Sequence, residues 1–191
     1  VLPTTGELVI SAKWSHRIRK VDSNGIIYTV AGTGISTNLD GSNLGDNGPA
    51  INATLSYPEA IVANAKGEIF ISNVSNGRIR KIGTDGVITT IAVNDAEMNY
   101  VRGMAMNSAG DLFFAEHHHS SIRKIDNATQ IITTVAGSYG GYSGENVTAI
   151  TARLRQPEGV AVNSNGEILI ADTPNARIRK VTPEGIINTI S

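Results

Sequence analysis

A phrase of five residues occurs four times in this chain, and no other feature restricts the fold as strongly. Each copy holds an isoleucine that is followed directly by Arg-Lys. The four copies run over residues 17–21, 78–82, 121–125 and 177–181. Their central isoleucines are 61, 43 and 56 residues apart. Self-similarity at a period of a few tens of residues is typical of folds built by stacking one supersecondary unit.

Each copy lies within a longer pattern of four apolar or β-branched runs separated by turn residues. In the last unit these runs are residues 159–162, 167–171, 177–181 and 187–190. Runs rich in Val, Ile and Thr favour strands, and the Gly, Asn and Asp between them suit tight turns. No helical period of useful length competes with this alternation. The sequence therefore predicts an all-β chain with four antiparallel strands per unit, which is the blade pattern of a β-propeller.

The last unit also carries a more specific resemblance. Residues 157–162, 166–172 and 175–181 together resemble an NHL repeat. Residues 30–34, 45–50 and 55–58 are similar to the long connector between such repeats. The resemblance covers nearly the whole chain and implies a β-propeller fold. It implies little about activity, because the family includes binding modules, scaffolds and a few enzymes.

We expect one partial propeller of about four blades over residues 1–191. The first blade, 1–36, is incomplete, and the others are expected at 58–93, 101–137 and 157–191. Long inter-blade connectors are expected at 37–57 and 138–156. NHL propellers usually close with six blades, and an uncovered apolar blade face costs about 25 cal/mol per Å². We therefore expect the chain to be part of a larger propeller, or to be completed by self-association with a second chain.

Composition excludes some classes of function and leaves others open. The formal net charge is −1, so no long-range field draws the chain to nucleic acid or to an anionic membrane. Cysteine is absent, which excludes disulfides and thiolate metal sites. No run of 18 apolar residues is present, so no membrane span is predicted.

The repeated phrases hold 11 of the 16 basic residues. One interpretation is a phosphate-binding surface, since some NHL proteins bind RNA through basic faces. The alternative is structural, with the long stems packed between sheets and the charged groups bound to carboxylates or carbonyls. The near-neutral net charge favours the structural interpretation and makes nucleic acid an improbable partner.

One cluster could hold a divalent metal such as zinc or calcium. His117 and His119 would share a face of an extended strand, and Glu116 could be a third ligand. The simpler alternative is a polar turn, because the other units place unrelated residues there. No cofactor and no catalytic residue is predicted otherwise, since neither a nucleophile elbow nor an ordered triad is found.

Exposed aromatic residues and glycosylation sequences complete the candidate sites. The aromatic candidates for a protein interface are Trp14, Tyr139 and Tyr142. Asn-x-Ser/Thr triplets, which are acceptors for N-linked glycans in secreted proteins, occur at Asn52, Asn73, Asn127 and Asn146.

The leading functional hypothesis is a non-enzymatic protein-interaction or structural module that works outside the cell. It would bind a protein partner, or assemble with itself, through its loops or open blade faces. The alternative is a metal-dependent lyase or hydrolase with a site near His117 and His119. RNA binding is a third and weaker interpretation.

Overall fold

The computed structural model describes residues 1–36, 44–92 and 100–191. Part of the predicted connector 37–57 and the last residue of the predicted blade 58–93 therefore lie outside the described residues. The chain divides into two compact units, Val1–Met98 and Asn99–Ser191.

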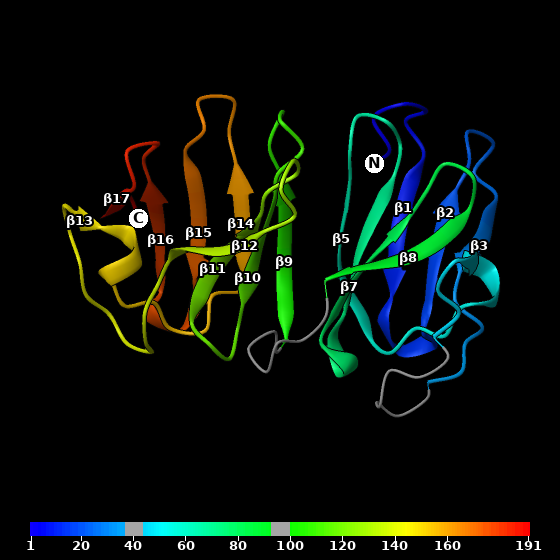
Figure 1. The fold of residues 1–191 in the computed structure, drawn as a ribbon, viewed down its shortest axis with the longest axis horizontal. Helices are drawn as coiled ribbons and strands as arrows, with labels where there is room; N and C mark the ends of the chain where they lie inside the picture. The colour runs from blue at the N-terminus through cyan, green and yellow to red at the C-terminus, as the bar shows by residue number, and fades with distance from the viewer. Residues whose placement is uncertain (37–43, 93–99) are drawn as a thin grey trace. The chain divides into compact units, whose positions relative to one another are not determined.

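The first unit contains two antiparallel sheets (Figure 1). One sheet has the strand order β1-β2-β3, with bounds Leu8–Ala12, Arg17–Val21 and Ile27–Ala31. The other has the order β4-β8-β7-β6-β5, with bounds Gly48–Pro49, Val87–Ala92, Arg78–Ile82, Ile69–Asn73 and Pro58–Ala63. Short 3-10 helices lie between strands at η1 (Lys13–Ser15), η2 (Ala50–Asn52) and η3 (Val74–Asn76).

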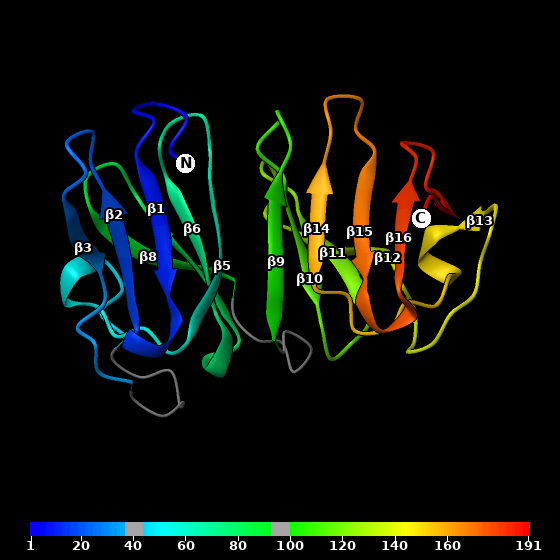
Figure 2. The ribbon, with the colours of Figure 1, turned by 180° about the vertical axis from the view of Figure 1, so that it is seen from behind.

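The second unit is built in the same way. One sheet has the order β12-β11-β10-β9, with bounds Ile132–Ala136, Ser121–Ile125, Leu112–Glu116 and Val101–Met106. The other has the order β13-β17-β16-β15-β14, with bounds Val147–Thr148, Ile186–Thr189, Arg177–Val181, Ile168–Asp172 and Gly159–Val162. Its 3-10 helices are η4 (Ala149–Thr151) and η5 (Thr173–Asn175). Figure 2 shows β9 and β14 side by side, where the two sheets meet.

The predicted all-β fold of antiparallel blades is confirmed, including a first sheet with three strands instead of four. The connectors hold a feature that the sequence does not reveal. Each contributes a strand of two residues, β4 or β13, that pairs with the outermost strand of the following blade. Two residues are too few to show the alternation by which a strand is recognised in a sequence.

In each unit the core lies between the two sheets. The isoleucine of the repeated phrase is at its centre, and both Ile18 and Ile122 are 0% exposed. A leucine from the connector, Leu55 in the first unit and Leu154 in the second, is buried in the same cluster. Stacked blades therefore bury the apolar face that one blade alone would leave in water.

Candidate functional site

The lysines of the repeated phrase are all paired with carboxylates. In each blade the lysine lies next to an acidic residue of the same sheet or of its turn. The pairs are Lys20 with Glu7 (2.5 Å), Lys81 with Glu68 (2.9 Å), Lys124 with Asp126 (3.4 Å) and Lys180 with Glu167 (2.7 Å). The salt bridge from Lys81 lowers the pKa of Glu68 below its ordinary value. These ammonium groups stabilise the sheets and do not form an unpaired basic surface.

In the second and fourth copies of the phrase, the arginine that follows the isoleucine is buried and anchors the connector. Arg80 is 0% exposed, and its guanidinium donates to Asp46 at 2.8 Å and to the Leu44 carbonyl at 3.2 Å. Arg179 is equally buried and donates to the carbonyl of Gly144. Burial lowers the pKa of Arg80 from its ordinary value.

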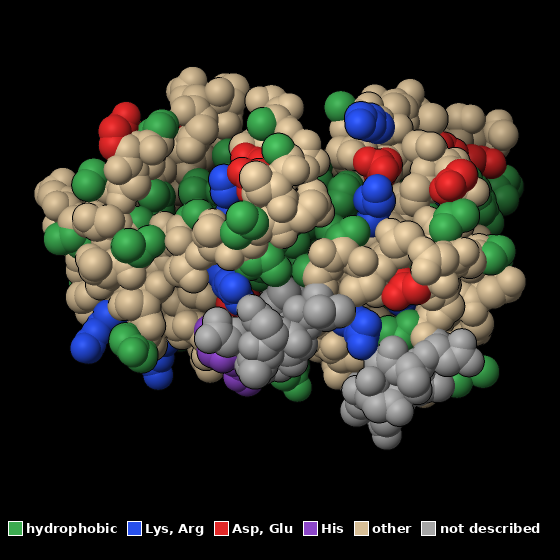
Figure 3. Space-filling view, in the orientation of Figure 1, with side chains coloured by type: hydrophobic (Ala, Val, Ile, Leu, Met, Phe, Trp, Pro, Cys, Tyr) green, Lys and Arg blue, Asp and Glu red, His purple; other side chains and the backbone are tan. Residues whose placement is uncertain are grey.

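These contacts support the structural interpretation of the basic residues. On the face seen in Figure 3, the basic and acidic side chains of the described residues lie intermixed.

The histidine cluster lies in a turn. Residues 117–120 follow the end of β10, so the argument from alternate residues of a strand does not apply to them. Glu116 is 1% exposed, and it accepts a hydrogen bond from the Ser121 hydroxyl at 3.2 Å. The Nδ1 of His119 is 4.0 Å from a Glu116 oxygen, while the Nε2 of His117 is 3.9 Å from Glu158.

No three His, Asp or Glu side chains among the described residues come together as metal ligands would. The metal site therefore stays a prediction, which metal analysis of the purified protein can test.

The same kind of turn leads into the Ile-Arg-Lys strand of every blade. We call residues 13–16, 74–77, 117–120 and 173–176 the lead-in turns. Each ends in a residue with left-handed backbone conformation, at φ between 51° and 56°. One of these residues, Gly77, is a glycine, while the others are His16, Ser120 and Ala176. The lead-in turns therefore share one backbone shape and differ in their side chains.

The aromatic candidates lie in loops and are exposed to different degrees. Trp14, in the first lead-in turn, is 80% exposed, and its ring meets the edge of Tyr57 at a centroid distance of 5.6 Å. Tyr139, in the second connector, is 75% exposed. Tyr142 is 43% exposed and is fixed, because its ring lies 4.0 Å from the Arg177 guanidinium. Trp14 and Tyr139 are therefore the aromatic side chains that are most available to a partner.

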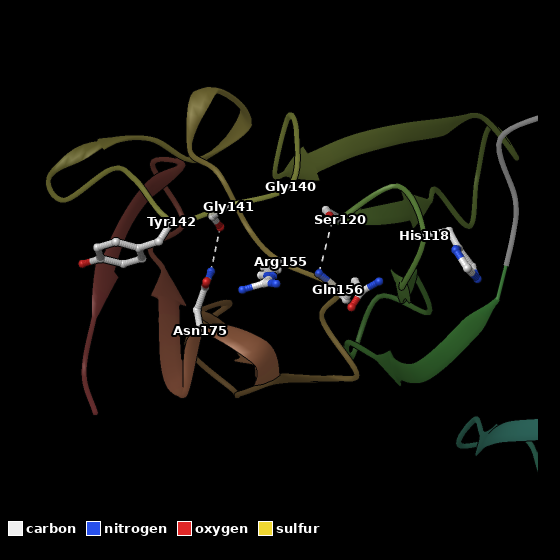
Figure 4. A pocket seen from close by; sticks show the side chains of 8 residues that line it. All are labelled: His118, Ser120, Gly140, Gly141, Tyr142, Arg155, Gln156 and Asn175. Carbon is white, nitrogen blue, oxygen red and sulfur yellow. Dashed lines mark hydrogen bonds between the residues drawn. The ribbon is translucent and has the colours of Figure 1, made fainter.

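The second unit contains a pocket of about 520 Å³ at its lead-in turns. It is lined by His118, Ser120, Gly140, Gly141, Tyr142, Arg155, Gln156 and Asn175 (Figure 4). The lining comes from two lead-in turns and from both ends of the connector between the blades. Nearly all of these groups are polar, so the hollow suits a polar ligand group.

Hydrogen bonds within the protein hold the walls of this pocket in place. The Ser120 hydroxyl accepts from the backbone N–H of Gln156 at 3.2 Å. The Asn175 amide donates to the Gly141 carbonyl at 2.7 Å and to Asp172 at 2.9 Å. The guanidinium of Arg155 lies between these two bonded pairs in Figure 4. Among the described residues, it has no hydrogen-bond or ion-pair partner.

Sequence reasoning identified only Tyr142 of this pocket. A usable signal was the pair Arg155-Gln156 before Pro157, because it aligns with Ser56-Tyr57 before Pro58 in the first unit. An arginine that replaces a small residue at a repeated loop position points to a role outside the scaffold.

The first unit has aromatic side chains where the second has the pocket. By alignment on the repeated phrase, Trp14 corresponds to His118 and Tyr57 to Gln156. The hydrogen bond from Gln156 to Ser120 has an equivalent in the first unit, where the His16 ring Nδ1 accepts from the backbone N–H of Tyr57 at 3.2 Å. The two units therefore present different chemistry on the same frame.

The glycosylation candidates differ sharply in exposure. Asn52, Asn127 and Asn146 are exposed, whereas Asn73 is 0% exposed. The side-chain oxygen of Asn73 accepts from the backbone N–H of Ser56 at 2.5 Å. A glycan on Asn73 would not fit this fold, so that candidate is excluded for the folded protein.

Two family models match the chain. The NHL repeat model matches residues 154–181, and the Teneurin NHL domain model matches residues 3–96. In the part of the chain that the structure describes, every helix is too short or too polar to cross a membrane.

Solved β-propeller structures resemble the chain at low identity. A streptogramin B lyase structure is 14% identical with a TM-score of 0.67, over 96% of this chain and 50% of that one. Inactive virginiamycin B lyase from Staphylococcus aureus with quinupristin is 17% identical with a TM-score of 0.66, over 100% and 54%. A chain of the nidogen/laminin complex is 11% identical with a TM-score of 0.66, over 97% and 61%.

This chain thus spans about half the length of the lyase structures. Such low identities show the fold alone. The family models, the sheet topology and the repeated phrase together identify the family of the chain. It belongs to the NHL-repeat family of β-propeller proteins.

Proposed function

We propose that this chain is a protein-interaction module that binds its partner through the lead-in turns and the connectors. The observation that carries the proposal is Trp14, which is 80% exposed at a turn position that needs no large side chain. The scaffold keeps the same turn with Val74-Ser75-Asn76 or Thr173-Pro174-Asn175. Exposed tryptophan and tyrosine side chains are the residues that most often dominate binding energy at protein interfaces.

The family supports this proposal. Teneurin NHL domains supply one matching model, and a chain of the nidogen/laminin complex shares the fold. Nidogen in that structure is bound to a protein partner.

Trp14→Ala tests the proposal. A displayed library of random peptides is panned against the chain, and the affinities of selected clones are compared among variants. We expect Trp14→Ala to lower the affinity of the selected clones by about tenfold or more, because it removes a large aromatic side chain from the interface. The matched control is Tyr28→Ala on strand β3, where the tyrosine is 39% exposed. Clones that bind Trp14→Ala as well as the unchanged chain would contradict the proposal.

We also propose that the module works outside the cell, on the strength of the same relatives and the exposed glycosylation sequences. Asn146 is exposed, and its side chain makes no hydrogen bond within the described residues. Expression through the secretory pathway of eukaryotic cells, followed by glycopeptide mass spectrometry, tests this. We expect glycans on Asn146 or Asn52. A secreted chain with both sites empty would count against the extracellular setting.

One blade face favours self-association as a second function. Ile178 is 37% exposed, whereas its counterparts in the other three copies of the phrase, Ile18, Ile79 and Ile122, are all 0% exposed. A shallow hollow beside Ile178 is lined in part by Ala171 and Ala176. We infer that a blade of a second copy covers this face. Sedimentation velocity should show association that Ile178→Glu abolishes, and a monodisperse monomer would contradict it.

A further inference from the structure

We propose that the pocket of the second unit recognises a carboxylate group of an acidic peptide segment. The inference rests on the proposed function, because it names the chemistry of one contact that a protein partner would make. Its basis is the arrangement of Arg155, Asn175 and Gln156 in Figure 4, which is independent of Trp14 and the first unit.

Arg155 provides the positive charge. Its backbone N–H donates to Asp172 at 2.7 Å, which fixes the start of the side chain. Its guanidinium is exposed and has no acceptor among the described residues. By contrast, Arg80 and Arg179 are buried and bonded to the connector of their own blade pair. Arg155 therefore differs from these structural arginines, because no acceptor in the described part of the chain occupies its guanidinium donors.

No acidic side chain lines this pocket. Two carboxylates that are bonded to lining residues of the pocket already have partners of their own. Asp172 is 0% exposed and accepts from the Arg155 backbone and the Asn175 amide. Glu145 accepts from the Tyr142 hydroxyl at 2.7 Å and from the Thr189 hydroxyl at 2.6 Å. Neither is free to satisfy the Arg155 guanidinium, so an incoming anion meets no competitor inside the pocket.

An amide side chain lies next to the arginine in the lining of the pocket, and an imidazole lines it further along. The Gln156 side chain makes no hydrogen bond within the described residues, and its backbone is held by Ser120. The His118 ring is positioned by edge contact with Tyr100 at a centroid distance of 4.4 Å. A planar guanidinium with an amide donor beside it matches the two oxygens of a carboxylate. The backbone of the pocket walls is already hydrogen-bonded, so the ordering that a ligand requires falls on the exposed side chains of Arg155 and Gln156.

The pocket is large enough for a side chain and its flanking backbone. Its volume of about 520 Å³ lies within the range of about 300–1,000 Å³ that is usual for ligand pockets. It is built from loops of two neighbouring blades, so an extended segment could place one acidic residue in the hollow. We therefore expect the ligand to be a glutamate or aspartate of a partner, with the rest of the segment running over the loops.

The test uses the full chain labelled with ¹⁵N and two blocked peptides, one of four glutamates and one of four glutamines. We expect the glutamate peptide to shift the amide signals of Gly140, Gly141 and Gln156 in a saturable way. The glutamine peptide should not. Arg155→Gln should raise the dissociation constant of the glutamate peptide by about tenfold, as expected for a lost charge-assisted hydrogen bond.

The matched control is Arg153→Gln. Arg153 is exposed on the same connector, two residues away, and does not line the pocket. It should change the dissociation constant by less than twofold. Both substitutions keep the backbone bonds, and the unchanged signals of the second unit report that each variant is folded.

Three outcomes would overturn the proposal. They are no saturable shift, equal affinity for Arg155→Gln, and tighter binding of a phosphoserine peptide than of the glutamate peptide. The last would identify the pocket as a phosphopeptide site. Failure here leaves the effect of Trp14→Ala untouched, so the two proposals can be separated.

Discussion

Gly137 is the residue at which a single methyl group should damage the second unit most clearly. It lies at φ 87°, directly after strand β12, where the chain leaves the blade. A Cβ at this position would be 2.3 Å from the Ser120 carbonyl oxygen and 2.9 Å from the Ser121 Cα. Gly137→Ala therefore presses on the lead-in turn that forms one wall of the pocket.

Two separate effects make up the loss of stability that we expect for Gly137→Ala. A non-glycine residue at positive φ costs about 1–2 kcal/mol, and reduced freedom of the unfolded chain returns part of it. The contact at 2.3 Å is more than 1 Å shorter than the 3.4 Å at which ordinary van der Waals contact begins. Relieving it requires a backbone shift, and overpacking of this kind costs about 1–3 kcal/mol. We expect a total near 3 kcal/mol.

Gly185 separates the two terms. It has φ 80°, and a Cβ there would meet nothing within 4 Å. Gly185→Ala should therefore cost only about 1 kcal/mol, from the backbone term alone. The measurement is the free energy of unfolding from urea denaturation of both variants. If the two values agreed within about 0.5 kcal/mol, the close approach of Gly137 to Ser120 would not be a real constraint.

Three further predictions concern stability. Arg80→Met should destabilise the first unit by about 3 kcal/mol in urea denaturation, because it removes the partner of Asp46 and leaves buried carbonyls unbonded. The pKa of Glu145 is lowered from 4.5 to about 2, chiefly by the hydrogen bond from the Thr189 hydroxyl. The stabilisation by its carboxylate is complete above pH 4.5 and is lost as the pH falls towards 2, so Glu145→Gln should flatten the acid limb of a stability–pH curve. Ala176→Gly should raise the melting temperature slightly, because Ala176 holds φ 51° where Gly77 holds φ 56° without strain.

The blade scaffold could be predicted from the sequence because its determinants are local and repeated. The alternation of apolar and polar residues predicts each of the longer strands. The turn Asn64–Glu68 shows why the turns were also recognisable. The Asn64 side-chain oxygen accepts from the backbone N–H groups of Lys66 and Glu68, and Gly67 has φ 87°. Such turns depend only on residues within a few positions of each other.

The features that could not be predicted from the sequence depend on contacts between distant residues. The strand Val147–Thr148 exists because the connector folds back onto Ile186 and Ile187, forty residues later in the chain. The structural role of Asn73 is equally hidden. Its triplet suggested a glycan acceptor, but its side chain bonds the backbone of Ser56 across the blade. A sequence motif cannot reveal burial that depends on a partner in a distant connector.

Comparison of the two units separates scaffold from function. The paired positions Gly32 and Gly137 would each place a Cβ 2.3 Å from a lead-in turn carbonyl, so both units require glycine there. The lead-in turns share a left-handed last residue, but their side chains differ between the units. Tyr57 and Gln156 occupy one frame, each with its backbone N–H bonded to the last side chain of a lead-in turn. Chemistry that varies on a fixed frame is expected where binding is determined by loops and stability by strands.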